Sequence, residues 1–420
     1  MSLIISILVV VKDYKNMIIK GQNHYKYHIK NLLDKMIGLN KKRKKFIVEI
    51  FCLFLSIKGK LNFLQFARFS EYGEQRFRQQ FEKSFDFLQF NKEMVLEHSS
   101  NNNIIAIDPS YIKKSGKHTP GGNHYWSGVA GEVKWGLEIT GIASIDLDNH
   151  TAFHLEAVQT FADLEQISLL DYYTDIIVQR KEQLQEISKH IVADAFFSKI
   201  NFVEKLTDNN FEVTSRFRND AALQYLFNGE QKKGRGRPKK FDGKIDYNNL
   251  NMNYFNSVEK SEKTKIYHAI VHSKSLKRNI NLVIVYTKNK KAWSHKLYFS
   301  TDLTLDAHTV LKYYRSRFQI EFLYRDAKQH TGLEDVQARS ENKLDFHFNL
   351  SLSTINIAKI THWLPIEKEK RPTFSMRNVK TMYHNELLLK RFFNVFGIPP
   401  NKQKNNHKIR ELINYGTIAA

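Results

Sequence analysis

Two aspartates each follow a short run of apolar residues, at places where a carboxylate could do chemistry. Asp108 follows Ile104 to Ile107, and Asp194 ends the run that starts at His190. Runs of this kind predict buried strands, so each aspartate is expected at the carboxyl end of a core strand. Clustered carboxylates bind hard divalent cations, and two such cations held together can cut and join phosphodiesters. Either residue taken alone is more simply a turn residue.

A third carboxylate lies on a helix that the apolar spacing predicts over 307–331, between a capping aspartate and a terminating glycine. Intervals of three, four and seven place four side chains on one face of this helix: Tyr314, Arg317, Glu321 and Lys328. Glu321 could complete a metal site while Arg317 and Lys328 hold phosphate oxygens. The alternative is an exposed helix on which Arg317 and Glu321 form an ordinary salt bridge.

The two aspartates and the spacing Y-x2-R-x3-E-x6-K resemble the DDE transposases of bacterial insertion sequences, in particular the insertion-sequence-four type with its YREK signature. The resemblance covers roughly residues 100–360, through IAIDPSYIKKSGK, HIVADAFFSK followed by SRFRNDAAL, and YYRSRFQIEFLYRDAKQHTGLEDVQARS. It implies an α/β fold: a ribonuclease H-like core with a β-rich insertion, flanked by helical N- and C-terminal regions. One departure is Phe318, which stands where many relatives have tryptophan.

The resemblance also implies roles for the residues that match the signature. The catalytic and metal-binding triad is expected to be Asp108, Asp194 and Glu321, holding two Mg²⁺ ions, with Mn²⁺ as an alternative. Contacts to the DNA backbone near the cleaved end are expected from Tyr314, Arg317 and Lys328. The implied reaction cuts the ends of the element and joins the 3′-hydroxyl to target DNA. The implied partners are double-stranded DNA, as terminal inverted repeats and target, and a second copy of the chain in a homodimer on DNA.

Two other functions remain open on the sequence. One is a catalytically inactive DNA-binding protein that inhibits transposition, which the presence of all three carboxylates disfavours. The other is a ribonuclease H-like nuclease that cuts DNA without joining strands. Strand-transfer products would exclude both.

Composition narrows the class of partner. The chain of 420 residues carries 65 Lys and Arg against 43 Asp and Glu, a formal charge of +22, which favours a polyanion such as nucleic acid over an anionic membrane surface. The single cysteine, Cys52, excludes an intrachain disulfide framework and a cysteine-clustered zinc site. The apolar run Leu3 to Val11 resembles a signal peptide less than it resembles a buried strand or an upstream start-site extension. The run Phe46 to Ile57 carries Glu49 and is too short to span a bilayer. We expect no membrane association, and a cytoplasmic protein working at a bacterial nucleoid.

The elements that must position these side chains divide the chain into five parts. We expect a helical, basic DNA-binding region over 1–97 and the first part of the core over 98–219, including a helix over 162–188. A β-rich insertion with a basic loop follows over 220–303, then the last core helices over 304–365 and a helical tail over 366–420 that could dimerise. In the first region, aromatic residues at helical spacing are expected in the core rather than stacked on bases. The basic run Lys41 to Lys45 and the arginines nearby are expected to face phosphates.

Two further features of the insertion bear on DNA. The loop Lys232 to Lys240 reads KKGRGRPKK, and its centre, with Arg235 and Arg237, resembles an AT-hook that lies in the minor groove of A·T-rich DNA. A solvated loop that makes nonspecific phosphate contacts is the open alternative. Trp293 lies where relatives with hairpin intermediates stack a flipped base on a tryptophan. A tryptophan in a strand is otherwise a core residue.

Overall fold

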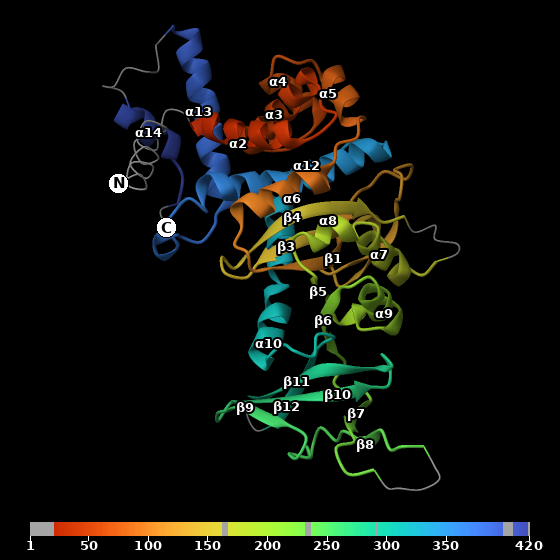
Figure 1. Ribbon diagram of the computed structural model, residues 1–420. Helices are drawn as coiled ribbons and strands as arrows, with labels where there is room; N and C mark the ends of the chain where they lie inside the picture. The colour runs from red at the N-terminus through yellow and green to blue at the C-terminus, as the bar shows by residue number, and fades with distance from the viewer. Residues whose placement is uncertain (1–20, 162–166, 232–236, 290–291, 398–405, 419–420) are drawn as a thin grey trace.

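The computed structural model describes residues 21–161, 167–231, 237–289, 292–397 and 406–418. The chain forms an elongated molecule with helices at one end, a helix-covered sheet in the middle and a strand-rich lobe at the other end (Figure 1). The apolar run Leu3 to Val11 and most of the AT-hook-like centre, including Arg235, lie outside the described residues. In the part of the chain that is described, no helix is both long and apolar enough to cross a membrane.

The described part of the N-terminal region, from residue 21 on, contains five helices: α2 (Gly21–Lys35), α3 (Lys41–Ser56), α4 (Phe63–Phe69), α5 (Glu74–Phe81) and α6 (Phe87–His98). They pack against α12 (Glu341–His362) and α13 (Met376–Val395), which return from the other end of the chain (Figure 1). Phe66, Phe77 and Phe81 are fully buried here, and the ring of Phe66 contacts the rings of the other two. The expectation that these aromatic residues form core is therefore confirmed.

The basic run at the start of α3 is not a uniform outward-facing patch. Arg43 is only 7% exposed, and its guanidinium donates to the carbonyl oxygens of Gln80 at 2.7 Å and Lys83 at 2.9 Å. It also lies over the ring of Phe346, 4.9 Å from the centroid. Burial lowers the pKa of Arg43 to about 10. Arg43 therefore joins α3 to the end of α5, and the expectation that the whole run faces phosphates is wrong at this position.

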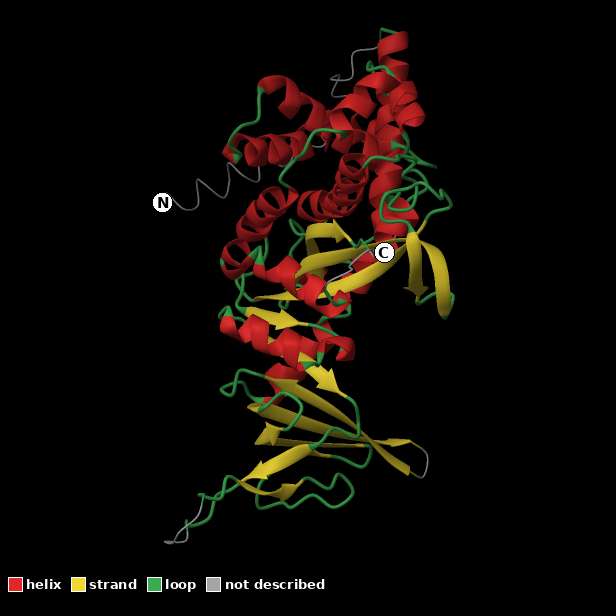
Figure 2. Cartoon of the chain, turned by 90° about the vertical axis from the view of Figure 1, so that its right-hand side faces the viewer, coloured by secondary structure: helices red, strands yellow, loops and turns green. Residues whose placement is uncertain are grey.

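The middle layer is a mixed sheet. Its central strands lie in the order β4 (Thr151–Gln159), β3 (Glu132–Asp146), β1 (Asn103–Lys113), β5 (His190–Val192) and β6 (Glu212–Phe217). The first three are antiparallel neighbours, whereas β5 is parallel to both β1 and β6. A short strand, β2 (Asn123–Ser127), pairs with the start of β3. Helices α6 and α12 pack on β4, and helix α9 (Ile200–Asp208) packs on β6 (Figure 2).

Strand β1 does not end at Asp108 as the apolar run predicts. It continues to Lys113, because β3 remains paired with it as far as Gly136. Its parallel pairing with β5 stops at Ala106. Beyond that point β1 has a strand neighbour on one side, and a strand with a free edge tolerates the missing amide hydrogen of Pro109. Asp108 thus lies within a strand, at the place where the neighbouring strand β5 has ended.

The helix expected over 162–188 is two shorter helices. Residues 162–166 lie outside the described residues, α7 spans Leu169–Val178, and α8 spans Lys181–Gln185. Ser168 caps α7 by accepting the amide hydrogen of Asp171. Arg180, with φ −109° and ψ 9°, leaves helical geometry between the two. Helical spacing continues across such a break, so periodicity alone did not indicate it.

The strand-rich segment extends the core sheet. It contains β7 (Leu223–Leu226), β8 (Phe241–Lys244), β9 (Asn256–Lys260), β10 (Thr264–Ser273), β11 (Arg278–Asn289) and β12 (Ala292–Ser300). Strand β12 pairs with the core strand β6 from Leu297 opposite Phe217 to Ser300 opposite Thr214. The rings of Phe217 and Phe299 stack across this junction at 4.2 Å. The described strands of core and insertion therefore form one sheet.

The helix predicted over 307–331 is interrupted. It is divided into α10 (Ala307–Ser316) and α11 (Gln319–His330), although Asp306 caps its start and Gly332, with φ +68°, follows its end as expected. Around Arg317 and Phe318 the amides of 318, 320 and 321 bond to carbonyls three residues back rather than four. This tighter local winding interrupts the α-helix while both residues keep helical dihedral angles. The remaining elements are the short 3₁₀ helices Ala195–Phe197 and Lys368–Lys370, and α14 (Asn406–Asn414).

Candidate active site

The tight turn between α10 and α11 places Arg317 between two of the predicted carboxylates. Its Nη1 lies 3.3 Å from Oδ1 of Asp108 on β1, and its Nη2 lies 2.9 Å from Oε1 of Glu321 on α11. The side chain of Arg317 is 14% exposed. The Arg317–Glu321 salt bridge, which the sequence offered as the alternative interpretation, is thus present. It coexists with the bridge to Asp108 and is not a feature of an isolated exposed helix.

Asp194 reaches the same edge of the sheet from the neighbouring strand. Ala106 of β1 pairs with Val192 of β5, and the two aspartates each lie two residues further along. Asp194 caps the 3₁₀ helix that follows by accepting the amide hydrogen of Phe196 at 2.9 Å. The hydroxyl of Ser215 on β6 donates to its carbonyl oxygen at 2.8 Å. Since the strands are parallel, the matched positions bring both carboxylates to one end of the sheet.

The charges of the three carboxylates act on one another. Burial raises the pKa of Asp108 to about 7; Arg317 opposes this shift, and the charges of Asp194 and Glu321 add to it. Burial disfavours the charge of Arg317, but Asp108 and then Glu321 and Asp194 favour it, and its pKa is raised. The residues therefore form one electrostatic cluster, in which a single guanidinium faces three acidic groups.

This cluster fits divalent cations by its donor chemistry. Among the described residues, no three His, Cys, Asp or Glu side chains are already arranged to hold a metal ion. At the candidate site the guanidinium of Arg317 lies between Asp108 and Glu321 instead. Carboxylate oxygens are the ligands that Mg²⁺ prefers, and the raised pKa of Asp108 reflects burial and repulsion that a cation would relieve. The oxygen donors of Asp108, Asp194 and Glu321 thus fit a divalent cation by their chemistry.

The other two signature residues also face this region. The ammonium group of Lys328 donates to the carbonyl oxygen of Tyr111 at 2.7 Å and to the hydroxyl of Ser110 at 3.1 Å, both just past Asp108. Tyr314 packs edge-on against Tyr298, with centroids 5.0 Å apart, and burial raises its pKa. The structure therefore brings all four signature residues together with both aspartates.

Tyr324 is a member of the site that the sequence did not single out. It is buried on α11, and its hydroxyl donates to the backbone carbonyl of Asp108 at 2.5 Å. Opposite Asp108 on β3 lies Gly141, where an added Cβ would overlap the Tyr324 hydroxyl. The sequence spacing could have identified Tyr324, because it lies seven residues after Arg317 and three after Glu321, on the same helical face.

Trp293 is not brought to the carboxylates. It lies on β12, six residues before Phe299, which pairs with Ser215 beside Asp194. At about 3.4 Å per strand residue, this places it about 20 Å from the carboxylate edge. Its ring is 39% exposed and contacts the ammonium of Lys265 at 4.5 Å. It lines a pocket of about 320 Å³ with other aromatic side chains, among them Tyr247, Tyr267, Tyr286 and His295.

The described part of the basic loop lies at the far end of the insertion. Arg237 is exposed, and Arg235 lies outside the described residues. Where the loop begins and ends, the side chain of Gln231 makes two hydrogen bonds to the backbone of Lys239, at 2.7 and 3.0 Å. The described residues of the loop, 237–240, lie between β7 and β8 in the chain.

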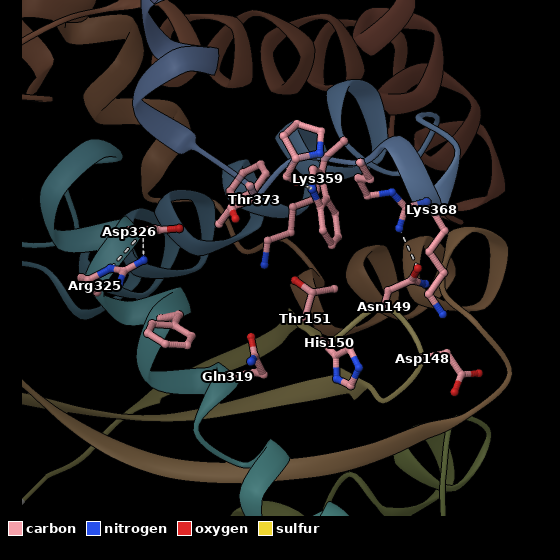
Figure 3. Close-up of a pocket in the computed structure, with 15 residues that line it drawn as sticks. Asp148, Asn149, His150, Thr151, Gln319, Arg325, Asp326, Lys359, Lys368 and Thr373 are labelled. Atoms are coloured by element: carbon pink, nitrogen blue, oxygen red, sulfur yellow. Dashed lines mark hydrogen bonds and ion pairs between the residues drawn. The ribbon is translucent and has the colours of Figure 1, made fainter. Parts of the chain in front are cut away.

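A separate pocket of about 570 Å³ borders α11 (Figure 3). Arg325 and Asp326 of α11 form an ion pair there at 3.1 Å. The buried Lys359 donates to the carbonyl oxygen of Ala152 at 2.6 Å, and burial lowers its pKa to about 8. The lining of this pocket includes none of the three carboxylates, so it is distinct from the candidate active site.

Comparison with known proteins gives one family match. Residues 174–357 match the family model described as "Transposase DDE domain". The matched range contains Asp194, Arg317, Glu321 and Lys328, and it leaves Asp108 outside. No curated protein matches the chain. The match covers less than half of the chain and is to a transposase DDE domain.

Among solved structures, the chain is similar to one titled "Cryo-EM structure of piggyBac transposase synaptic complex with hairpin DNA". The identity is 12%, the TM-score is 0.39, and the match covers 96% of this chain and 84% of that one. A likeness this loose does not align individual site residues.

Proposed function

We propose that the chain is a transposase of the insertion-sequence-four type, from a bacterial insertion sequence, that cuts the element ends and joins the 3′-hydroxyl to target DNA. One observation carries the proposal: Arg317 is bound to both Asp108 and Glu321, while Asp194 lies at the matching position of the adjacent parallel strand. The strand order, three antiparallel strands followed by two parallel ones, is consistent with a ribonuclease H-like core.

Asp108, Asp194 and Glu321 would hold two Mg²⁺ ions, or Mn²⁺ in their place. Bound cations of this kind activate an attacking oxygen and stabilise the leaving oxygen of a phosphodiester. The chain supplies the frame for this chemistry, since β1 and β5 fix the aspartates and Tyr324 anchors the backbone of Asp108.

The cationic side chains would position the DNA. Arg317 would exchange its carboxylate partners for phosphate oxygens, because its planar fork suits either group. Lys328, held against β1 by Tyr111 and Ser110, would keep a point charge beside the same strand of DNA. Tyr314, partly buried next to Arg317, would contact the backbone near the cleaved end.

Other DNA contacts belong to the rest of the chain. We place binding of the terminal inverted repeats on the N-terminal helices and the insertion, with Arg235 and Arg237 in a minor groove. Trp293 and Lys265 offer a surface for an unpaired base. Trp293 lies about 20 Å from the carboxylates, and at about 3.4 Å per base pair this distance corresponds to about six base pairs of DNA. Two copies would act together in a homodimer that bridges two ends in the cytoplasm, at the nucleoid.

The test is cleavage of a labelled duplex that carries the inverted repeat found in the DNA flanking the coding region. Asp108→Asn, Asp194→Asn and Glu321→Gln should each lower Mg²⁺-dependent cleavage by at least about 10³-fold, with little loss of DNA binding. Asp326→Asn, on the same helix but facing the separate pocket, is the matched control and should cleave normally. Cleavage retained in any triad variant would refute the assignment. Nicked duplex without strand-transfer products would favour a nuclease instead.

A further inference from the structure

A second group of cations surrounds a pocket that shares only Lys328 with the proposed active site. The pocket has a volume of about 640 Å³, and we call it the basic pocket. Its cationic lining consists of Lys58, Lys60, Lys328, Arg377 and Lys380. Against these five cations stands one carboxylate in the lining, Asp335. The pocket therefore has an excess of positive charge, which comes mainly from the other four side chains because burial lowers the pKa of Lys380 to about 7.

The cations of the basic pocket come from three segments that are far apart in the sequence. The loop after α3 contributes Lys58 and Lys60, the last turn of α11 contributes Lys328, and the first turns of α13 contribute Arg377 and Lys380. The N-terminus of α13 is one wall, and the N-terminal end of a helix attracts anions. The packing of any single one of these elements does not explain why cations from all three meet at one pocket.

Most of this charge has no acidic partner in the protein. Over the described residues, Lys58, Lys60 and Arg377 make no ion pair, and all three are exposed. Asp335 is already engaged, because it accepts the amide hydrogen of Leu61 at 2.9 Å. Lys380 is 6% exposed and donates to the carbonyl oxygen of Phe54 at 2.9 Å. An anion in the pocket would thus meet free ammonium and guanidinium groups.

Lys328 connects the basic pocket with the candidate active site. It lines the pocket, yet its ammonium group reaches the carbonyl oxygen of Tyr111, three residues past Asp108. Along α11 it lies seven residues from Glu321, which is about 10 Å at 1.5 Å per residue. With one phosphate per about 3.4 Å of each strand, this corresponds to about three nucleotides.

We propose that the basic pocket binds the phosphodiester backbone of the DNA strand whose end lies at the carboxylates, about three nucleotides from the cleaved phosphate. This proposal rests on the proposed function for its choice of DNA as the ligand. It adds an anion-binding site that joins the N-terminal helices, α11 and α13 around a single strand.

The first test measures duplex binding as a function of salt. Lys58→Ala with Lys60→Ala should lower the slope of log Kd against log salt by about two, because each phosphate contact contributes about 0.9. Lys181→Ala with Lys189→Ala removes the same charge from exposed positions near α8 and should leave the slope unchanged. An unchanged slope in the pocket variant, or an equal change in the control, would overturn the proposal.

The second test locates the contact on the strand. Single neutral methylphosphonates at each of the first six linkages next to the cleaved end should weaken wild-type binding several-fold near the third linkage. The same substitution should have no effect in the pocket variant. The proposal fails if the methylphosphonates weaken binding equally at every linkage. It also fails if inorganic phosphate binds in the pocket but does not change the affinity for the duplex. Because both tests measure binding, cleavage that is absent in the wild type would refute the proposed function and leave this result standing.

Discussion

The hydroxyl of Tyr324 donates a hydrogen bond to the backbone carbonyl oxygen of Asp108. This bond joins α11 to β1 across 216 positions of the chain, and it fixes the strand at the residue whose side chain faces Arg317. The side chain of Tyr324 is buried, and its polar atom is engaged with the backbone of β1. It is a positioning residue, and its contribution to the chemistry passes through Asp108.

Tyr324→Phe should lower the cleavage rate at saturating DNA while leaving DNA affinity close to wild type. Loss of the hydrogen bond costs about 1 kcal/mol of stability and frees Asp108 to shift. Tyr172→Phe is the matched control, because the Tyr172 hydroxyl likewise donates to a backbone carbonyl, that of Gln159, at 2.7 Å. The control should lose similar stability and keep its cleavage rate. Equal loss of cleavage in both variants would show a general folding defect instead.

Gly141→Ala should damage the same contact from the other side. The new methyl group would overlap the Tyr324 hydroxyl, and overpacking of this kind typically costs about 1–3 kcal/mol. Cleavage should fall together with the thermal midpoint, and adding Tyr324→Phe should recover part of the stability. Gly128→Ala, at a glycine with nothing within 4 Å of an added Cβ, should change neither. A fully stable Gly141→Ala protein would contradict the observed packing.

Arg317→Gln should make folding stability depend on divalent metal. Without the guanidinium, Asp108 and Glu321 lose their counter-charge, and the protein should melt several degrees lower in EDTA. Mg²⁺ should raise the midpoint more in this variant than in the wild type, because a ligand that binds the folded state stabilises it. Differential scanning fluorimetry with and without Mg²⁺ measures both effects. An identical Mg²⁺ response in the two proteins would argue against metal at these carboxylates.

Arg43→Met should destabilise the protein without altering the salt dependence of DNA binding. The variant leaves the carbonyl oxygens of Gln80 and Lys83 without their donor, at an expected cost of about 2–3 kcal/mol. Lys42→Met, at the exposed neighbouring position, should have little effect on stability. Urea denaturation and duplex titration separate the two roles. A smaller slope of log Kd against log salt for Arg43→Met would indicate that Arg43 contacts DNA.

Lys359 should give the unfolding free energy a distinct dependence on pH. Burial lowers its pKa to about 8 from 10.5, so between these values the unfolded chain binds more protons than the folded one. Lys359 therefore lowers the free energy of unfolding below about pH 8, and this loss of stability disappears as the pH rises toward 10.5. Relative to Lys359→Met, the wild type should gain on the order of 2 kcal/mol between pH 8 and pH 10. Parallel pH curves for the two proteins in urea denaturation would contradict this.

The sequence predicted the parts of the site that depend on local pattern. Apolar runs located the strands next to Asp108 and Asp194, and helical spacing placed Arg317, Glu321 and Lys328 on one face. Those patterns reflect which side of an element is buried, and burial is encoded within a few residues. The Transposase DDE family match then agreed with the resemblance over 174–357.

The remaining features depend on contacts between distant segments. The turn at Arg317 and Phe318 has no proline or glycine to signal it, and a straight helix satisfies the same spacing. The inward direction of Arg43 depends on carbonyl groups of α5 and the loop after it, 37 and 40 positions away. The distance of Trp293 from the carboxylates, about 20 Å, depends on the length and pairing of β12, which the sequence order does not give.

The pairing of β6 with β12 has a mechanical consequence. Because the insertion shares a ladder with the core, and the stacked Phe217 and Phe299 lock its register, the two cannot swing apart without breaking strand hydrogen bonds. They should therefore unfold in a single cooperative transition. A protein built in this way has no hinge at that junction, so the strand-rich lobe and the core sheet are expected to move as one body.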